Sequence, residues 1–136
     1  MKFTRLLSAI DFSEPSVQAF ETAVALSRAL AADLHVIHVI EAEPANPDIA
    51  LQQKALAAMD ALVAPVIEAD GDLQINTEIT TGSAAAEILN YAKIHKIELI
   101  VLGAKGLSLL EEALLGGTAK RLVSEAPCSV LAVRPA

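Results

Sequence analysis

The sequence predicts an α/β fold, a three-layer sandwich in which helices cover both faces of an open five-stranded parallel sheet. Short apolar runs alternate with stretches of helical periodicity along the whole chain. The run at residues 99–102 is apolar throughout, which is typical of a strand buried on both faces. Such alternation leads to parallel strands joined by right-handed crossovers. At 136 residues, we expect one domain spanning residues 1–136.

The first part of the chain predicts two strands and the helix between them. Residues 6–10 form an apolar run, and helical spacing follows over about residues 15–32. Ser13 is a candidate N-cap, and Pro15 suits the first turn of this helix. Residues 34–40 form the second apolar run. We therefore expect a strand, a helix and a second strand in this order.

A long apolar helix and an edge strand are expected next. The helix carries apolar residues from Leu51 to Val66 on one face. Pro65 is expected to kink or end it, and Gly71 to close it. Residues 73–79 alternate between apolar and polar, a pattern typical of a half-exposed strand at a sheet edge.

The last part of the chain predicts two helices and two strands. A third helix begins at Gly82 and Ser83, before the buried strand at residues 99–102. A fourth helix is expected at residues 118–126, and the fifth strand at residues 129–133.

Composition excludes several classes of function. The net charge of −7 argues against non-specific binding to nucleic acid or to anionic membranes. The longest apolar run, residues 61–67, is far shorter than the ~18 residues of a membrane span. Cys128 is the only cysteine, so an internal disulfide is impossible. We expect a cytoplasmic protein.

Four of the six glycines lie between Gly103 and Gly117. The apolar strand is followed by Gly103-Ala104-Lys105-Gly106, then nine residues, then Gly116-Gly117-Thr118 at the start of a helix. Glycine lets backbone amides approach a ligand closely, and a helix N-terminus favours an anion. This spacing indicates a phosphate site.

Other residues are expected near the same place. Asp11 follows the first strand, Val39 lies near the end of the second, and Gly103 ends the fourth. Ligands of open parallel sheets bind outside the carboxyl ends of strands, where the strand order reverses. If the first and fourth strands are neighbours, with the second and third beyond the first, these residues line one crevice.

The combined pattern resembles the universal stress protein family. The glycines match that family's G-x2-G-x9-G pattern for ATP binding, in which Ser or Thr follows. Residues 9–14 resemble its first strand and turn, and residues 126–133 resemble its last strand. The resemblance covers essentially the whole chain. It implies the strand order 3-2-1-4-5 and a homodimer paired through residues 129–133.

The resemblance also implies an adenine nucleotide as ligand, namely ATP, ADP or AMP, with Mg²⁺ as a possible companion. Asp11 would lie near the adenosine moiety, and the main chain of Val39 would contact adenine. The backbone around Gly103 and Gly106 would approach ribose and phosphates. Gly116 and the residues after it would hold phosphate oxygens.

The sequence departs from the family pattern at two places. Gly117 stands where ATP-binding members carry a hydroxyl, and a missing hydrogen bond weakens binding about three- to tenfold. Thr118 follows and offers a hydroxyl one residue later. Glu111 and Glu112 stand where similar proteins often have basic residues, and Lys105 could offset their charge.

Plainer interpretations of these residues lead to a second hypothesis. Asp11 could satisfy turn amides only, Val39 could serve core packing, Lys105 could be a solvated cation, and Thr118 could be a helix N-cap. The protein would then be a dimeric interaction module without a nucleotide. An enzyme is not expected, because no Walker pattern, carboxylate cluster or nucleophilic triad is present.

Overall fold

The computed structural model describes residues 2–104 and 117–134, in which five parallel strands alternate with four helices. The strand order is β3-β2-β1-β4-β5, which confirms the predicted α/β topology. The strands are β1 (Arg5–Ala9), β2 (Asp33–Ile40), β3 (Ile75–Thr81), β4 (Leu99–Gly103) and β5 (Ser129–Val133). The helices are α1 (Glu14–Leu30), α2 (Ile49–Ala69), α3 (Ala84–Ile94) and α4 (Gly117–Glu125).

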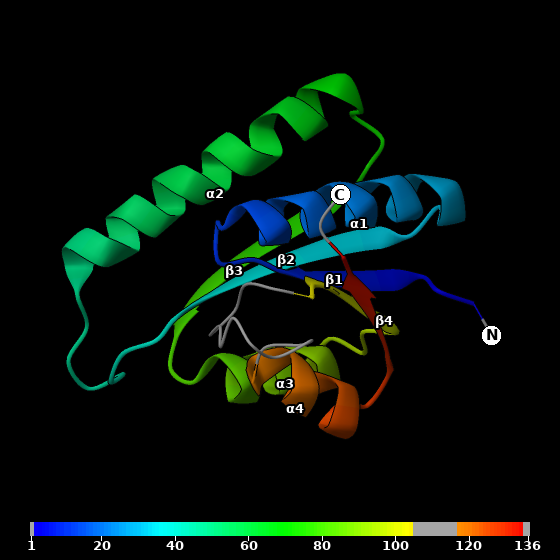
Figure 1. Cartoon of the computed structure of the whole chain (residues 1–136). Coiled ribbons are helices and arrows are strands. Elements are labelled where there is room, and N and C mark those ends of the chain that lie inside the picture. Colours follow the sequence, from blue (N-terminus) through cyan, green and yellow to red (C-terminus); the bar gives the residue numbers. More distant parts are fainter. Residues whose placement is uncertain (1, 105–116, 135–136) are drawn as a thin grey trace.

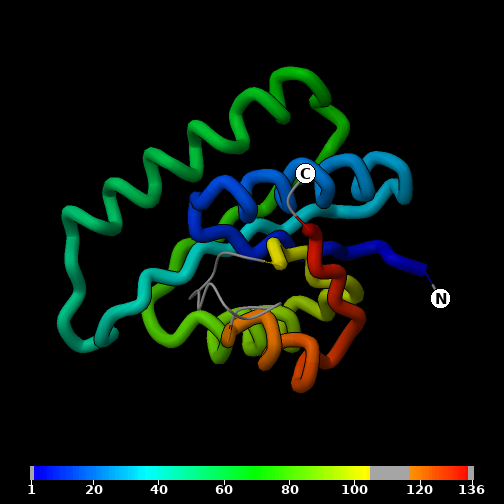
Figure 2. Tube along the Cα trace, in the orientation of Figure 1, coloured from blue at the N-terminus to red at the C-terminus, as the bar shows by residue number. Residues whose placement is uncertain are grey.

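The helices form two layers, with α1 and α2 on one face of the sheet and α3 and α4 on the other (Figure 1). Successive side chains of a strand point to opposite faces, so β1 contributes to both cores. Leu6 packs in one core with Phe20 of α1 and Met59 of α2. Leu7 packs in the other core, with residues of α3 and α4. Figure 2 shows the central position of β1 between these layers.

The start of α1 follows the predicted signals. The Oγ of Ser13 accepts a hydrogen bond from the N–H of Ser16 at 3.4 Å, and Pro15 lies in the first turn. Proline is tolerated there because the first helical N–H groups have no partner within the helix. The helix ends at Leu30, and its C-cap Ala31 has a left-handed φ of 53°.

Of the two effects expected of Pro65, a kink or an end, the structure excludes the end, because α2 continues past this residue. The helix continues to Ala69, and its C-cap is Asp70 rather than Gly71. A proline removes one intrahelical hydrogen bond, but the next turn re-forms here because the N–H of Asp70 donates to the carbonyl of Val66 at 3.0 Å.

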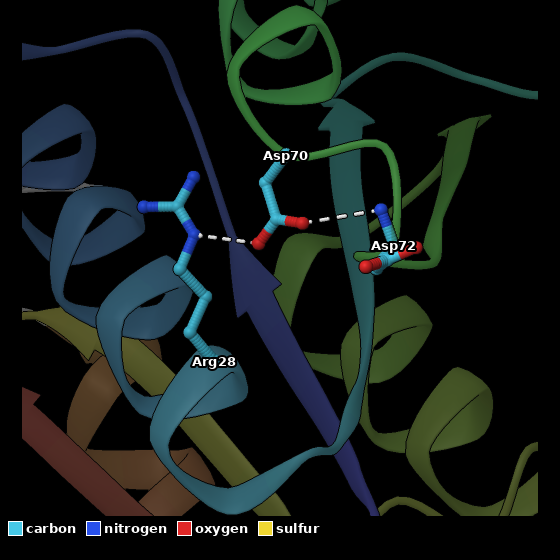
Figure 3. A network of polar contacts seen from close by, with 3 residues as sticks. All are labelled: Arg28, Asp70 and Asp72. Carbon is cyan, nitrogen blue, oxygen red and sulfur yellow. Dashed lines mark hydrogen bonds and ion pairs between the residues drawn. The ribbon is translucent and has the colours of Figure 1, made fainter.

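A turn after α2 explains why β3 begins two residues later than expected. One Asp70 oxygen accepts the N–H of Asp72 at 3.1 Å, and the Asp70 carbonyl accepts the N–H of Leu73 at 3.3 Å. The other Asp70 oxygen pairs with Arg28 of α1 at 3.0 Å (Figure 3). The edge position predicted for this strand is confirmed, because β3 ends the strand order.

The amino-terminal rim of the sheet is tied by one carboxylate. Oε1 of Glu98 accepts the N–H of Thr4 at 2.7 Å and the N–H of Arg5 at 3.0 Å. The hydroxyl of Thr4 donates to the same oxygen. These hydrogen bonds, led by that of the hydroxyl, lower the pKa of Glu98 below its ordinary value. The side chain thus joins the starts of β1 and β4.

Among the helices that the structure describes, none has the length and apolar character that crossing a bilayer would require.

Candidate functional site

The carboxyl-terminal rim of the sheet contains the point at which the strand order reverses. From β1 the chain continues to β2 and β3 on one side, whereas β4 and β5 lie on the other. Ligands of such sheets bind outside the strand ends at this point. Asp11 follows β1, Val39 lies near the end of β2, and Gly103 is the last residue of β4.

Asp11 and Val39 line the same pocket, whose volume is about 310 Å³. The structure therefore brings these two predicted site residues together. The remaining lining residues come from the end of β2, the first turn of α2 and the start of α3: His38, Ile40, Glu41, Leu51 and Ala84. The pocket combines apolar walls with a few polar groups, as small-molecule sites commonly do.

Asp11 also organises the turn between β1 and α1. Its Oδ1 accepts the N–H of Ser13 at 2.9 Å, and its own N–H donates to the Oγ of Ser16 at 3.3 Å. Phe12 between them has a φ of 65°, a left-handed conformation that is unusual for a bulky residue. Backbone strain of this kind is concentrated at binding sites. Asp11 therefore performs the plain structural role and still reaches the pocket.

His38 is a pocket residue that the sequence analysis did not identify. Its Nδ1 lies 2.8 Å from the carbonyl oxygen of Ile10, so this nitrogen carries the proton and donates. Its ring lies 4.7 Å from the ring of Phe12, measured between centroids. The carbonyl and the aromatic ring fix the imidazole at the pocket wall. Its position next to Val39 was the only signal in the sequence.

Gly103 is the last residue of β4, which lies next to β1 and pairs on its other side with β5. It is buried and stands opposite Val133 of β5. The next residue, Ala104, donates its N–H to the carbonyl of Val133 at 2.8 Å. Because β4 is the direct neighbour of β1, Gly103 lies at the same rim as Asp11.

Gly117 and Thr118 form the first turn of α4. Gly117 is exposed, and a Cβ built on it meets no atom of the described residues within 4 Å. Thr118 is only 7% exposed, so its side chain belongs to the interior. Three predicted site residues, Lys105, Gly106 and Gly116, lie outside the described residues, as do Glu111 and Glu112.

The other face of β2 carries an aromatic cluster with a packing role. Nδ1 of His35 lies 2.6 Å from the hydroxyl oxygen of Tyr91, and both residues are buried. Burial, and next the neighbouring His95, lower the pKa of His35. Burial, and next Glu78, raise the pKa of Tyr91 to about 12. The imidazole of His35 and the phenol of Tyr91 are therefore both uncharged at neutral pH. Within residues 2–104 and 117–134, no cluster of three or more His, Cys, Asp or Glu side chains is suited to hold a metal ion.

The chain is similar to proteins that share this fold over their whole length. The model of the universal stress protein family matches residues 2–134. Universal stress protein YxiE of Bacillus subtilis is 30% identical, over 97% of this chain and 99% of that protein. A universal stress protein of Thermus aquaticus is 32% identical over 97% and 99% of the two chains.

Solved structures agree with these relatives in fold. Hypothetical protein MJ0577 superposes with a TM-score of 0.88 at 21% identity, over 100% of this chain and 99% of that one. A universal stress protein in complex with cAMP gives a TM-score of 0.78 at 20% identity and 98% coverage of each chain. An Arabidopsis thaliana member with AMP bound gives 0.67 at 18% identity, with coverages of 98% and 92%. The sheet order, the family match and the full-length relatives together show that this chain belongs to the universal stress protein family.

Proposed function

We propose that this protein is a cytoplasmic stress-response regulator that binds an adenine nucleotide, ATP in the first place, at the carboxyl rim of its sheet. The observation that carries the proposal is the pocket shared by Asp11 and Val39, beside the reversal of strand order. Its role is binding rather than catalysis, with occupancy controlling which partners the protein contacts.

The pocket suits the adenosine part of the ligand. The main chain of Val39 offers the donor and acceptor that an adenine edge needs, and the apolar side chains of Leu51 and Ala84 flank the base. The Asp11 carboxylate accepts hydrogen bonds from a ribose hydroxyl or an amino group. The two fold relatives solved with cAMP and AMP carry ligands of the same chemical class.

The phosphates would extend from this pocket toward β4 and α4. Gly103 is on β4 and Val39 is on β2, and only β1 lies between these two strands. The first N–H groups of α4, at Gly117 and Thr118, have no acceptor within the helix, and the helix dipole favours an anion there. The buried Thr118 would contribute its main chain. Lys105, Gly106 and Gly116 complete the proposed phosphate loop.

Isothermal titration calorimetry with ATP, in the presence and absence of Mg²⁺, tests this function. We expect saturable binding with a dissociation constant in the micromolar range, and the comparison shows whether Mg²⁺ takes part. ADP, AMP and GTP are the matched ligands for the phosphate and base preferences. The absence of heat with every adenine nucleotide would refute the proposal.

A second candidate is an interaction module of the same fold that has lost the nucleotide. Gly117 favours it, because the family pattern has a hydroxyl at that position. The two candidates differ in whether the pocket is occupied in cells, which nucleotide analysis of the purified protein decides.

We also propose a homodimer paired through β5, residues 129–133. This strand lies at the end of the sheet, and its Leu131 is 37% exposed. An apolar edge strand invites pairing with a second copy. Light scattering at micromolar concentration should give twice the monomer mass, and a monomer would exclude this assembly.

A further inference from the structure

The edge of the sheet opposite β5 is formed by β3, whose outer side has no strand beside it in the described chain. The carbonyl of Gln74 accepts the N–H of Leu34, and the N–H of Gly82 donates to the carbonyl of Ile40, so these even-numbered residues face β2. Backbone groups alternate in direction along a strand. The N–H and C=O groups of the odd-numbered residues from Ile75 to Thr81 therefore point outward.

An apolar flank of α2 lies on one side of this edge. Ile49, Leu56 and Ile67 are 65%, 55% and 44% exposed. They are spaced by seven and eleven residues, so they share one flank of the helix. Leu56 lines a hollow of about 220 Å³ together with Ile79 and Thr81 of β3. Gln52 lines the same hollow, so the side of the edge that faces α2 is uncharged and combines apolar with polar side chains.

The side of the edge that faces α3 is acidic. A second hollow, of about 180 Å³, is lined by Glu78 and Thr80 of β3 and by Glu87 and His95 at α3. Neither hollow is lined by a lysine or arginine among the described residues. Two carboxylates here favour a partner with basic side chains.

We propose that the outer edge of β3 is a docking site for an extended peptide segment in which apolar and basic residues alternate. The segment extends the sheet by one strand through the outward backbone groups, which is the β-augmentation mode of recognition. Its apolar side chains pack beneath the flank of Ile49, Leu56 and Ile67, and its basic side chains face Glu78 and Glu87. This surface is separate from the nucleotide pocket.

The carboxylate of Glu78 beside this edge makes the proposed site selective for its partner. Charged residues on an edge strand oppose pairing between copies of the same chain, because like charges would meet. Glu78 therefore disfavours a second copy of β3 and favours a basic strand. The charge of Glu78 thus determines which strands bind, and the backbone hydrogen bonds determine how the bound strand aligns with β3.

Fluorescence anisotropy with a labelled peptide of alternating lysine and valine over seven residues, the length of β3, tests the site. We expect saturable binding to the full-length protein. A peptide with the same composition but blocks of valine and lysine, and an N-methylated version of the alternating peptide, are the matched controls. Both should bind much more weakly, because the blocked peptide lacks the side-chain alternation and the N-methylated peptide lacks the backbone donors. Equal binding of the blocked peptide would mean simple charge attraction and would overturn the proposal.

Thr77→Pro tests the edge on the protein side. The N–H of Thr77 points outward, so proline removes a donor from the docking edge without removing a bond to β2. We expect affinity for the alternating peptide to fall about tenfold or more, whereas Thr77→Ala retains it. Circular dichroism and the melting temperature check that the Thr77→Pro protein is folded.

Glu78→Lys provides a test that does not depend on a proline. It should weaken binding of the lysine-valine peptide and strengthen binding of a glutamate-valine peptide. Unchanged affinity in both Thr77→Pro and Glu78→Lys would refute the site. A β3 edge occupied by a second copy would appear as a smaller assembly for Thr77→Pro in light scattering, with no peptide binding, and would also refute it.

Discussion

The two rims of the sheet are built differently. At the amino-terminal rim, side chains join the elements: Glu98 ties Thr4 and Arg5, and Arg28 pairs with Asp70 in the wall of a hollow of about 370 Å³. At the carboxyl-terminal rim, a strained turn at Phe12 stands beside an open pocket of about 310 Å³. Each rim has a hollow, but the Arg28 and Asp70 side chains of the amino-terminal one pair with each other, whereas the carboxyl-terminal one lies at the reversal of strand order.

This difference separates the residues that stabilise the fold from those that we assign to binding. Residues of the central strand contribute to both, because β1 begins at the amino-terminal rim and ends at the carboxyl-terminal rim. Substitutions at the two ends of β1 should therefore change different measurements. The predictions below follow this division, from the largest expected effect to the smallest.

Leu6→Ala should lower stability without changing nucleotide affinity. Leu6 is fully buried near the start of β1 and packs in the core beneath α1 and α2. Truncating a buried leucine costs about 2–5 kcal/mol of the free energy of unfolding. Urea unfolding measures this loss, and calorimetry at low temperature measures ATP affinity. A large loss of affinity in the folded variant would contradict the separation of the rims.

Asp11→Ala should mainly affect ATP binding. A hydrogen bond to a charged group contributes about 1.5–3 kcal/mol, so affinity should fall about tenfold or more. Stability should also fall by about 1 kcal/mol, because the N–H of Ser13 loses its acceptor. Asp11→Asn is the matched control, since its amide oxygen still accepts from Ser13. Unchanged ATP affinity in Asp11→Ala would mean that Asp11 only stabilises the turn and does not bind the nucleotide.

Gly117→Ser should increase ATP affinity. The substitution fits residues 2–104 and 117–134, because a Cβ at this position meets none of their atoms within 4 Å. A restored hydroxyl provides one hydrogen bond to phosphate, which corresponds to a gain of about three- to tenfold. Gly117→Ala lacks the hydroxyl and is the control in the same calorimetric titration. A gain from no detectable binding to strong binding would favour the interaction module over the nucleotide regulator.

Glu98→Gln should reduce stability at neutral pH and lose this effect in acid. The pKa of Glu98 is lower in the folded state than its ordinary value of 4.5, so the ionised form stabilises the fold above that pH. The contribution shrinks as the pH falls below 4.5 and disappears below the lowered native pKa. Urea unfolding of both proteins across this range measures the difference. A difference that grows toward acid pH would contradict this role of Glu98.

Periodicity and the shared direction of parallel strands predict the layers, whereas the strand order, and with it the meeting of Asp11 with Val39, is what the family resemblance implies. The sequence leaves open whether Pro65 kinks α2 or ends it, and the structure shows the helix continuing to Ala69, with Met59 and Val63 buried. The pocket role of His38 was also missed. It depends on a hydrogen bond to Ile10, whose position requires the register of β1 and β2.

Native mass spectrometry of the freshly purified protein tests the central claim most directly. The account predicts a co-purified mass that matches an adenine nucleotide, which Asp11→Ala reduces. A protein that carries no nucleotide and takes up none from added ATP would contradict it.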